Sequence, residues 1–360
     1  MGIAQIRDKW GEKLLILAHH YQRDEIVEVA DLLGDSFQLS KMAAENEEAE
    51  AIVFCGVHFM AETADILVNN PARLEKRNGK RVPVIIPDAT AGCALADMAD
   101  IEQLNALWKR LERLGIAEEI TPVTYINSAA SLKSFCGVRG GAVCTSSNAE
   151  KVVRWALEKK PRLLFAPDQY LGRNTADALD IPPEEILLLP TDAQNEVKDE
   201  QLMRAKVLLW PGYCPVHLDV QPEQLLASRK KYPNAWVIVH PECTPQVVAI
   251  AEMAGSTSVI IEQIAESPAG SVWMVGTERH LVERLAARFP GKTILLPESP
   301  PQSENPQPFV CETMAQTRLS HLEKALTDLD EGNPSNVITV ADEEVSGALL
   351  ALERMLQNGT

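Results

Sequence analysis

LLILAHHYQ, at residues 14–22, is an apolar strand that ends in polar residues, and its recurrence predicts the architecture of the chain. The same pattern returns as PVTYINSAA at 122–130 and as AWVIVHPEC at 235–243. A helical stretch follows each strand, and then a short turn rich in Ser, Thr and Gly. These turns are LGDS at 33–36, CTSSN at 144–148 and GSTS at 255–258. Self-similarity of this kind predicts repeated copies of one supersecondary unit.

Two further apolar strands complete each copy. The first of them reads AIVFCG, RLLFAPD or VWMVGT, and the second reads VIIPDATAGC, VLLWPGYC or TILLPESP. Short apolar strands that alternate with helices are typical of α/β domains with parallel sheets. We therefore expect three similar αβα domains related by pseudo-threefold symmetry. Their predicted bounds are 1–92, completed by the C-terminal helices at 312–360, then 93–213 and 214–311.

Each copy leads to a cysteine, namely Cys93, Cys214 and, after a Pro-rich stretch, Cys311. Ligands of open α/β sheets gather beyond the carboxyl ends of the strands, so a threefold arrangement would direct the three thiols to one centre. Three thiolates would bind a soft metal centre and leave one coordination position open for chemistry. An iron–sulfur cluster fits better than zinc, although the usual ferredoxin spacings are absent. A [4Fe–4S] cluster so held keeps one iron free to act as a Lewis acid.

The other four cysteines fit this pattern less well. Seven cysteines without a signal-peptide core argue against a disulfide framework. We expect Cys55, inside an apolar strand, to be a buried core thiol, and Cys136 to be structural. For Cys144, a core position and a position beside the site both remain open. Cys243 breaks the repeat pattern, and we do not expect it to be a ligand.

Composition excludes several classes of protein. The chain has 360 residues, with 34 Lys+Arg against 51 Asp+Glu and a net charge of −17. That balance argues against a general nucleic-acid binder, which needs a surplus of cations. Apolar residues make up 46% of the chain, enough for a real core. No apolar run approaches the ~18 residues of a membrane span. We expect a cytoplasmic protein without nucleic-acid or membrane partners.

A set of motifs in a fixed order carries a resemblance to a known family. The motifs are LAHHYQ, GDS, VFCGVHFMAETA, AGCALADM, TYINSAA, CTSSNA, FAPDQYLG, GYCPVH, HPEC, GSTS and GTE, spread over about 14–330. With them the chain resembles quinolinate synthases, the iron–sulfur enzymes of de novo NAD biosynthesis. One departure is CETMAQTRL at 311–319, where the family pattern would be C-P-x-M.

The resemblance implies a transferase-type condensation and dehydration. Iminoaspartate and dihydroxyacetone phosphate would give quinolinate with loss of phosphate and water, on a [4Fe–4S] cluster with one open iron. The resemblance leaves open how iminoaspartate arrives. It would come by transient contact with an L-aspartate oxidase or dehydrogenase, or by free diffusion.

The resemblance also implies roles for residues at the strand ends and turns. His19 and His240 would lie beside substrate anions, and Asn127 would orient the substrate. Hydroxyl groups would bind carboxylate or phosphate oxygens, and these belong to Ser36, Ser146, Ser256 and Thr257. A plain helix N-capping role is compatible with the same hydroxyls.

Proton transfer is the third implied task. Tyr21, Tyr125 and Glu242 match the active-site tyrosines and glutamate of the family, and we expect them to move protons. The other histidines and one glutamate of the matched motifs and helices are not expected to take part in proton transfer. His58, Glu62 and His217 are predicted to be structural or supporting, and His280 and His321 to lie on the surface of helices.

Two rival interpretations remain at this point. Diphthamide synthesis proteins and the reductive terminal enzyme of the isoprenoid pathway also combine three domains with three cysteines, but they lack the LAHHYQ, YINS and HPEC motifs. A non-enzymatic iron–sulfur sensor or electron carrier would more naturally use four ligands, and it would not need His, Tyr and hydroxyl groups at the strand ends.

Overall fold

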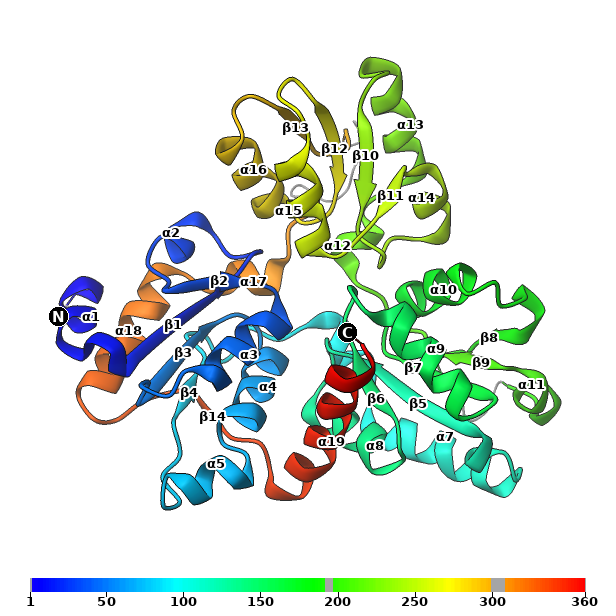
Figure 1. Ribbon diagram of the computed structural model, residues 1–360, viewed down its shortest axis with the longest axis horizontal. Helices are drawn as coiled ribbons and strands as arrows, with labels where there is room; N and C mark the ends of the chain where they lie inside the picture. The colour runs from blue at the N-terminus through cyan, green and yellow to red at the C-terminus, as the bar shows by residue number, and fades with distance from the viewer. Residues whose placement is uncertain (1, 192–196, 299–307, 360) are drawn as a thin grey trace.

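Three predominantly parallel sheets form the framework of the computed structural model, which describes residues 2–191, 197–298 and 308–359. The sheets lie in three lobes around a common centre (Figure 1). The first sheet has the order β14-β4-β3-β1-β2, the second β6-β5-β7-β9-β8 and the third β11-β10-β12-β13. The strands of the first sheet are β1 (Leu14–His19), β2 (Leu32–Gly34), β3 (Ala51–Cys55), β4 (Val84–Ile85) and β14 (Val337–Ile338). Those of the second are β5 (Ile120–Tyr125), β6 (Ala142–Cys144), β7 (Arg162–Ala166), β8 (Ile186–Leu188) and β9 (Val207–Leu209). Those of the third are β10 (Trp236–Val239), β11 (Met253–Ala254), β12 (Val272–Gly276) and β13 (Thr293–Leu295).

The three sheets share one strand order. In each, the second strand of the copy pairs with the first, the first with the third, and the third with the fourth, all in parallel. β8 extends the second sheet, and β14 adds an antiparallel edge to the first. The α/β fold with three similar domains, predicted from the repeat, is confirmed.

Helices cover both faces of each sheet (Figure 1). The first lobe holds α1 (Ile3–Trp10), η1 (Gly11–Lys13), α2 (Asp24–Val27), α3 (Ser36–Glu45), α4 (His58–Val68), α5 (Pro71–Lys76) and α18 (Leu319–Asp330). The second holds α7 (Ile101–Arg113), η2 (Ala117–Glu119), α8 (Ala130–Val138), α9 (Ala149–Lys159), α10 (Gln169–Ala178), η3 (Pro183–Glu185), α11 (Asp199–Arg204) and α19 (Asp342–Asn358). The third holds α13 (Pro222–Lys231), α14 (Pro245–Ile250), α15 (Thr257–Glu266) and α16 (Arg279–Arg288). Three short helices connect the lobes: α6 (Ala94–Asp97), α12 (Pro215–Leu218) and α17 (Glu312–Gln316).

The continuous apolar runs of the strands follow from this two-sided cover. Every residue of β1 is buried. Leu15 and Leu17 pack into one core of the first lobe, whereas Leu14, Ile16 and Ala18 pack into the core on the opposite face. The side chains alternate between the faces because successive residues of a strand point to opposite sides.

The C-terminal helices divide between two lobes, and this corrects the expectation that 312–360 completes the first domain. α18 does pack against α1 and β3 of the first lobe. α19 packs instead against α8 and β6 of the second lobe, where Ala348 and Leu352 join the core. Gly137 of α8 and Gly347 of α19 let these two helices approach closely, which makes the packing of α19 specific for α8. Among the residues described, no helix combines the length and apolarity needed to cross a membrane.

Candidate active site at the centre of the three lobes

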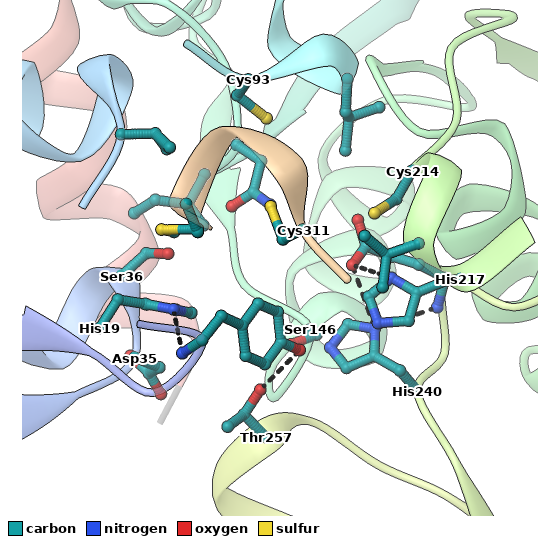
Figure 2. Close-up of a pocket in the computed structure, with 18 of the residues that line it drawn as sticks. His19, Asp35, Ser36, Cys93, Ser146, Cys214, His217, His240, Thr257 and Cys311 are labelled. Atoms are coloured by element: carbon teal, nitrogen blue, oxygen red, sulfur yellow. Dashed lines mark hydrogen bonds and ion pairs between the residues drawn. The ribbon is translucent and has the colours of Figure 1, made fainter. Parts of the chain in front are cut away.

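A cavity of about 310 Å³ lies where the carboxyl ends of the strands from all three lobes meet (Figure 2). Nearly all of the residues predicted from the sequence line it. They are His19, Tyr21, Ser36, Cys93, Tyr125, Asn127, Ser146, Cys214, His240, Glu242, Thr257 and Cys311. Ser256 is not among the lining residues. It is the N-cap of α15, where its hydroxyl accepts from the Val259 amide at 3.4 Å and from the Ser147 hydroxyl at 2.8 Å.

The three central cysteines occupy equivalent local structures. Cys93 is the N-cap of α6, Cys214 of α12 and Cys311 of α17. Backbone N–H groups of the helix that each cysteine begins donate to its sulfur. All three are partly exposed to the cavity, whereas the other four cysteines are buried. N–H groups that point at sulfur favour its thiolate form, which is the form that binds metals.

The thiols at this centre resist ionisation when no cation is present. Burial, with a smaller contribution from the nearby sulfur of Cys311, raises the pKa of Cys93 to about 12. Burial also raises the pKa of Cys214, to which Cys93 and Cys311 both contribute. Three mutually repelling sulfurs, each with N–H donors, need a positive centre between them. This donor set fits a three-thiolate metal cluster.

A second group of possible ligands shares Cys214. One ligand atom each from Cys214, His217 and Glu242 lie within 4.8 Å of one another. His217 and Glu242, however, are almost completely buried and engaged with each other, since His217 Nδ1 lies 3.2 Å from Glu242 Oε2. The same ring uses Nε2 for the hydroxyl of Thr277 at 3.2 Å. Nε2 of His217 is thus hydrogen-bonded to Thr277, whereas Nδ1 faces the Glu242 carboxylate at ion-pair distance but makes no hydrogen bond with the described residues.

A chain of polar contacts connects Tyr21 with Glu242. The Tyr21 hydroxyl lies 3.1 Å from the hydroxyl of Thr277, which in turn contacts His217. His217 contacts Glu242, and His240 Nδ1 lies 3.1 Å from the same carboxylate oxygen. The two imidazole rings stack with their centroids 4.2 Å apart. Hydrogen bonds join the Tyr21 hydroxyl, Thr277 and His217, and the imidazole of His217 then faces the Glu242 carboxylate at ion-pair distance, an arrangement suited to proton transfer.

The charge states of this chain follow from burial and neighbours. Burial alone would raise the pKa of Glu242, but the imidazoles of His217 and His240 outweigh it and hold that pKa well below its usual range. The second buried carboxyl, Asp168, has a raised pKa because of burial and of the negative Glu242. Burial also raises the pKa of Tyr21. The shifts in pKa therefore favour the carboxylate form of Glu242 and the protonated phenol of Tyr21.

Neutral imidazoles and hydroxyls line much of the rest of the cavity, together with the carboxyl groups of Asp35, Asp219 and Glu312. Burial lowers the pKa of His19 and of His240, which leaves both rings neutral. Because His19 Nδ1 accepts from the amide of Tyr21 at 3.1 Å, its proton lies on Nε2. Among the described residues that line the cavity, none is Lys or Arg. Anions would meet hydroxyls, imidazole N–H groups and the N-termini of α3, α9 and α15, which begin at the predicted turns.

Comparison with known proteins gives this site its context. The family model described as "NadA: Quinolinate synthetase A protein" matches residues 2–357. A quinolinate synthase of Rhodopirellula baltica is 48% identical over 356 residues, which cover 98% of this chain and 89% of the relative. One from Bacillus pumilus is 45% identical over 354 residues, covering 98% of this chain and 91% of the relative.

The chain belongs to the quinolinate synthase family. It is therefore an enzyme, and the rival interpretation as a sensor or electron carrier falls away. A third relative, from Anoxybacillus flavithermus, is 46% identical over 354 residues, which cover 98% of this chain and 92% of the relative. The ordered motifs quoted from the sequence were the correct guide to the family.

The register of the sheets revises one equivalence within this quinolinate synthase fold. Aligned from their first residues, the segments LLILAHHYQ, PVTYINSAA and AWVIVHPEC place His19, Asn127 and His240 at the same position. In the first sheet His19 pairs with Gly34, which lies two residues before Ser36. In the second sheet Tyr125 pairs with Cys144, which lies two residues before Ser146. His19 is thus equivalent to Tyr125, and Asn127 to Tyr21. The strand-end turns differ in length, which the spacing of apolar residues does not reveal.

Several residues of the site were missed or undervalued in the sequence. His217 was assigned a structural or supporting role, but it contacts both Glu242 and Thr277; its signal was the helical spacing of three from Cys214. Thr277 gave no signal beyond the GTE motif. His280, predicted on the surface, has a side chain only 20% exposed, with Nδ1 2.7 Å from the buried Glu278.

The remaining predicted placements can be stated briefly. Cys55 and Cys136 are buried, as predicted, and Cys144 is a core thiol of the second lobe. Cys243 is also buried, and its thiol donates to the Gly276 carbonyl at 3.7 Å. Glu62 accepts from the Ala130 amide at the start of α8. The side chain of His58 is exposed, whereas that of His321 is half-buried with Nδ1 3.2 Å from Asp88.

Proposed function

We propose that this protein condenses iminoaspartate with dihydroxyacetone phosphate to give quinolinate, with loss of phosphate and water. We propose further that Cys93, Cys214 and Cys311 hold a [4Fe–4S] cluster. The observation that carries the proposal is the convergence of one cysteine from each fourth-strand position on a single cavity, which the predicted anion-binding and proton-carrying residues also line. Membership of the quinolinate synthase family supports the same reaction.

The three cysteines would each ligate one of the four irons of the cluster. When bound, such a cluster supplies one iron without a protein ligand, a Lewis acid that polarises a substrate oxygen. The walls around the sulfurs are partly apolar, with Val57, Phe59 and Met60 among them. Apolar walls exclude water and strengthen electrostatic interactions with the substrates.

Substrate anions would be bound by hydrogen-bond donors rather than by cationic side chains. Iminoaspartate carries two carboxylates, and dihydroxyacetone phosphate carries a phosphate. Ser36 is the first residue of α3 and Thr257 the first of α15, while Ser146 and Ser147 precede α9. Their hydroxyls, together with the positive ends of these helix dipoles, would bind the anions from three directions, although Asp35 already caps two amides of α3 and Ser256 one of α15. The Nε2–H of His19 would add a further donor.

Proton transfers would run along the chain from Tyr21 to Glu242. The buried phenol of Tyr21 stays protonated because its pKa is raised, so it can donate to an oxygen or nitrogen of the substrate. Thr277 and His217 would return a proton to the phenolate. Glu242, held as a carboxylate by two imidazoles, would accept the proton released elsewhere in the reaction. Tyr125, which also lines the cavity and has a raised pKa, would serve as a second donor.

The decisive experiment is anaerobic purification followed by three measurements on one sample. Iron and acid-labile sulfide are quantified, visible and EPR spectra are recorded, and quinolinate formation is assayed with iminoaspartate generated in the assay. We expect iron and sulfide in equal amounts, a [4Fe–4S] spectrum and quinolinate production. A zinc-containing, sulfide-free protein, or an iron–sulfur protein that makes no quinolinate, would refute the proposal.

A further inference from the structure

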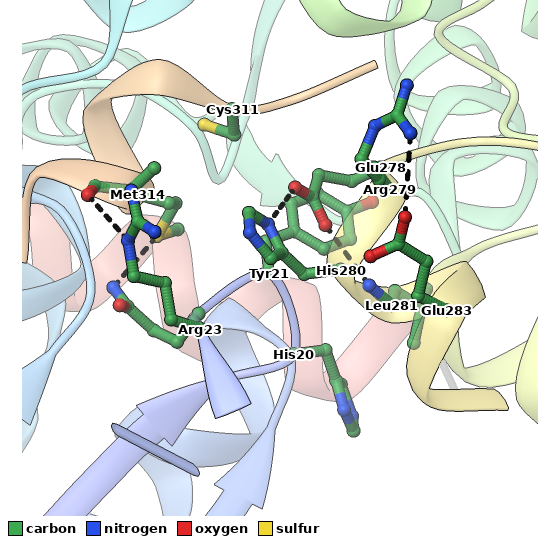
Figure 3. A network of polar contacts seen from close by, with 12 residues as sticks. His20, Tyr21, Arg23, Glu278, Arg279, His280, Leu281, Glu283, Cys311 and Met314 are labelled. Atoms are coloured by element: carbon green, nitrogen blue, oxygen red, sulfur yellow. Dashed lines mark hydrogen bonds and ion pairs between the residues drawn. The ribbon is translucent and has the colours of Figure 1, made fainter. Parts of the chain in front are cut away.

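Cys311 lies in a segment that passes from the third lobe to the first, and two sets of contacts hold that segment. In Figure 3, Arg279 lies on one side of Cys311, and Arg23 and Met314 lie on the other. Two residues before Cys311, Phe309 is completely buried in the core that contains Val237 and Met274. The segment is therefore anchored by an aromatic side chain immediately before the cysteine.

The backbone of Phe309 adopts a conformation that a bulky residue avoids. Its φ is +67°, in the left-handed region. A phenylalanine there persists only when surrounding contacts impose it. The neighbouring hydrogen bonds supply that constraint, and they mark the segment as one with a specific shape to keep.

Arg279 grips this segment with both its main chain and its side chain. Its amide donates to the carbonyl of Phe309 at 2.8 Å. Its guanidinium donates to the carbonyl of Pro308, from Nη2 at 3.1 Å and from Nε at 3.3 Å. Because Arg279 is the first residue of α16, these bonds tie the segment to a rigid helix of the third lobe.

Asp219 holds the same residue from a second direction. Its Oδ2 accepts from the amide of Phe309 at 3.2 Å. Asp219 is the C-cap of α12, the short helix whose N-cap is Cys214. One hydrogen bond thus links the helix that begins at Cys214 to the residue two before Cys311. The relative position of these two cysteines depends directly on it.

The first lobe holds the other end of the segment. Arg23 Nε donates to the carbonyl of Ala315 at 3.1 Å. The side-chain amide of Gln22 donates from Nε2 to the sulfur of Met314 at 3.6 Å. With Arg279 and Asp219 before the cysteine and these contacts after it, Cys311 is held on both sides.

We propose that Arg279 and Asp219 are positioning residues that place Cys311 against Cys214 for cluster binding. They act through the backbone of Pro308 and Phe309 rather than as ligands of the cluster. This inference rests on the proposed function, because it takes Cys311 as a cluster ligand. With these contacts intact, the protein should lose iron slowly. Without them, a loosened Cys311 segment would release the cluster to competing ligands sooner.

The test measures the rate of iron release to a chelator, anaerobically and without substrates, in loaded protein. Arg279→Ala and Asp219→Ala should release iron about tenfold faster than wild type, the factor expected when one hydrogen bond to a charged group is lost. Arg229→Ala is the matched control. Arg229 also binds a backbone carbonyl of the third lobe, that of Ile250, but at a distance from Cys311 in the fold. It should release iron at the wild-type rate.

Two further measurements separate positioning from a general loss of structure. Asp219→Asn keeps a carbonyl oxygen that can accept from Phe309, so it should retain iron nearly as well as wild type. The melting temperatures of the cluster-free proteins should be alike, because the lobe cores are untouched. The positioning role alone would be overturned if Arg279→Ala released iron no faster than Arg229→Ala, or if Asp219→Asn released it as fast as Asp219→Ala. The proposed function and the positioning role would be overturned together if the wild type bound no iron and sulfide.

Discussion

At the scale of single residues, the seven cysteines divide by their surroundings. Cys93, Cys214 and Cys311 reach the cavity and receive backbone N–H groups, whereas Cys55 and Cys136 are enclosed by apolar cores. Burial raises the pKa of Cys136 to about 12, as it does for Cys93, so acidity does not distinguish the two classes. What distinguishes them is convergence on one cavity.

Replacing a central cysteine should therefore abolish the cluster. Cys93→Ala, Cys214→Ala and Cys311→Ala should each lose the visible absorbance of the iron–sulfur centre and the activity, because two thiolates cannot hold the cluster in place. Cys136→Ala is the control, and it should keep both. The measurement is iron content with the visible spectrum after anaerobic purification. An active Cys311→Ala protein with a normal spectrum would contradict the ligand assignment.

The contact between Tyr21 and Thr277 permits a second prediction. Tyr21→Phe removes the phenolic proton, and Thr277→Val keeps the shape but breaks the link to His217. Each should lower kcat by about 10²-fold, the usual size of a general acid–base contribution, while the cluster spectrum stays unchanged.

Thr121→Val is the matched control for this pair. Thr121 is equally buried and donates to the Ala156 carbonyl, but it lies at the amino end of β5. Its turnover should stay close to that of wild type. Normal turnover of Thr277→Val would exclude Thr277 as a relay, and loss of its cluster would assign it a structural role instead.

At the scale of elements, α19 shows how a close crossing selects a partner. A Cβ added to Gly137 of α8 would lie 1.8 Å from the backbone oxygen of Gly347 in α19. A Cβ added to Gly347 would lie 2.3 Å from the hydroxyl of Ser134 and 2.9 Å from its carbonyl oxygen. The helices touch backbone to backbone, which leaves room for hydrogen at both positions and for nothing larger.

Gly347→Ala should accordingly destabilise the protein despite the better helix propensity of alanine. Overpacking of a close contact costs about 1–3 kcal/mol, more than the ~1 kcal/mol gained from propensity. Thermal unfolding followed by circular dichroism should show a lower melting temperature. Gly291→Ala, where an added Cβ meets nothing within 4 Å, should leave it unchanged. Equal melting temperatures for the two variants would show that α19 can shift away from α8 at no cost.

At the scale of the whole molecule, the candidate active site exists only because three lobes meet. Arg284 of α16 connects the third lobe to the loop of the first lobe that carries Tyr21. Its guanidinium donates to the carbonyls of His20 and Gln22 at 2.8 and 2.6 Å, and it pairs with Asp24 at 2.7 Å. The second and third lobes meet through Ser147 and Ser256. The positions of catalytic groups therefore depend on contacts between lobes.

Arg284→Ala should loosen Tyr21 relative to the third lobe without unfolding either lobe. We expect kcat/KM to fall by about tenfold or more, as for loss of a hydrogen bond to a charged group, while iron content stays unchanged. Steady-state kinetics and iron analysis on the same preparation test this expectation. Arg173→Ala, which breaks an ion pair with Asp177 within α10, should have wild-type kinetics. Unaltered kinetics for Arg284→Ala would show that Tyr21 is held by other contacts.

The amino-acid sequence was sufficient to predict the sheets, the threefold repeat, the convergence of Cys93, Cys214 and Cys311 on one cavity, and the family. These features depend on local signals: continuous apolar runs, turn residues and motifs of a few residues, all of which can be read from neighbours along the chain. Even a cavity at the centre followed from the rule that parallel strands end on the same edge of a sheet.

Pairwise contacts between distant segments needed the folded structure. The equivalence of His19 with Tyr125 depends on strand register, and the packing of α19 on α8 depends on two glycines far apart in sequence. The bonds from Thr277 to Tyr21 and from Arg279 to Phe309 join residues whose types alone carry no such signal. Register and side-chain pairing are set by the packing of whole surfaces, so they emerge only when the three lobes are assembled.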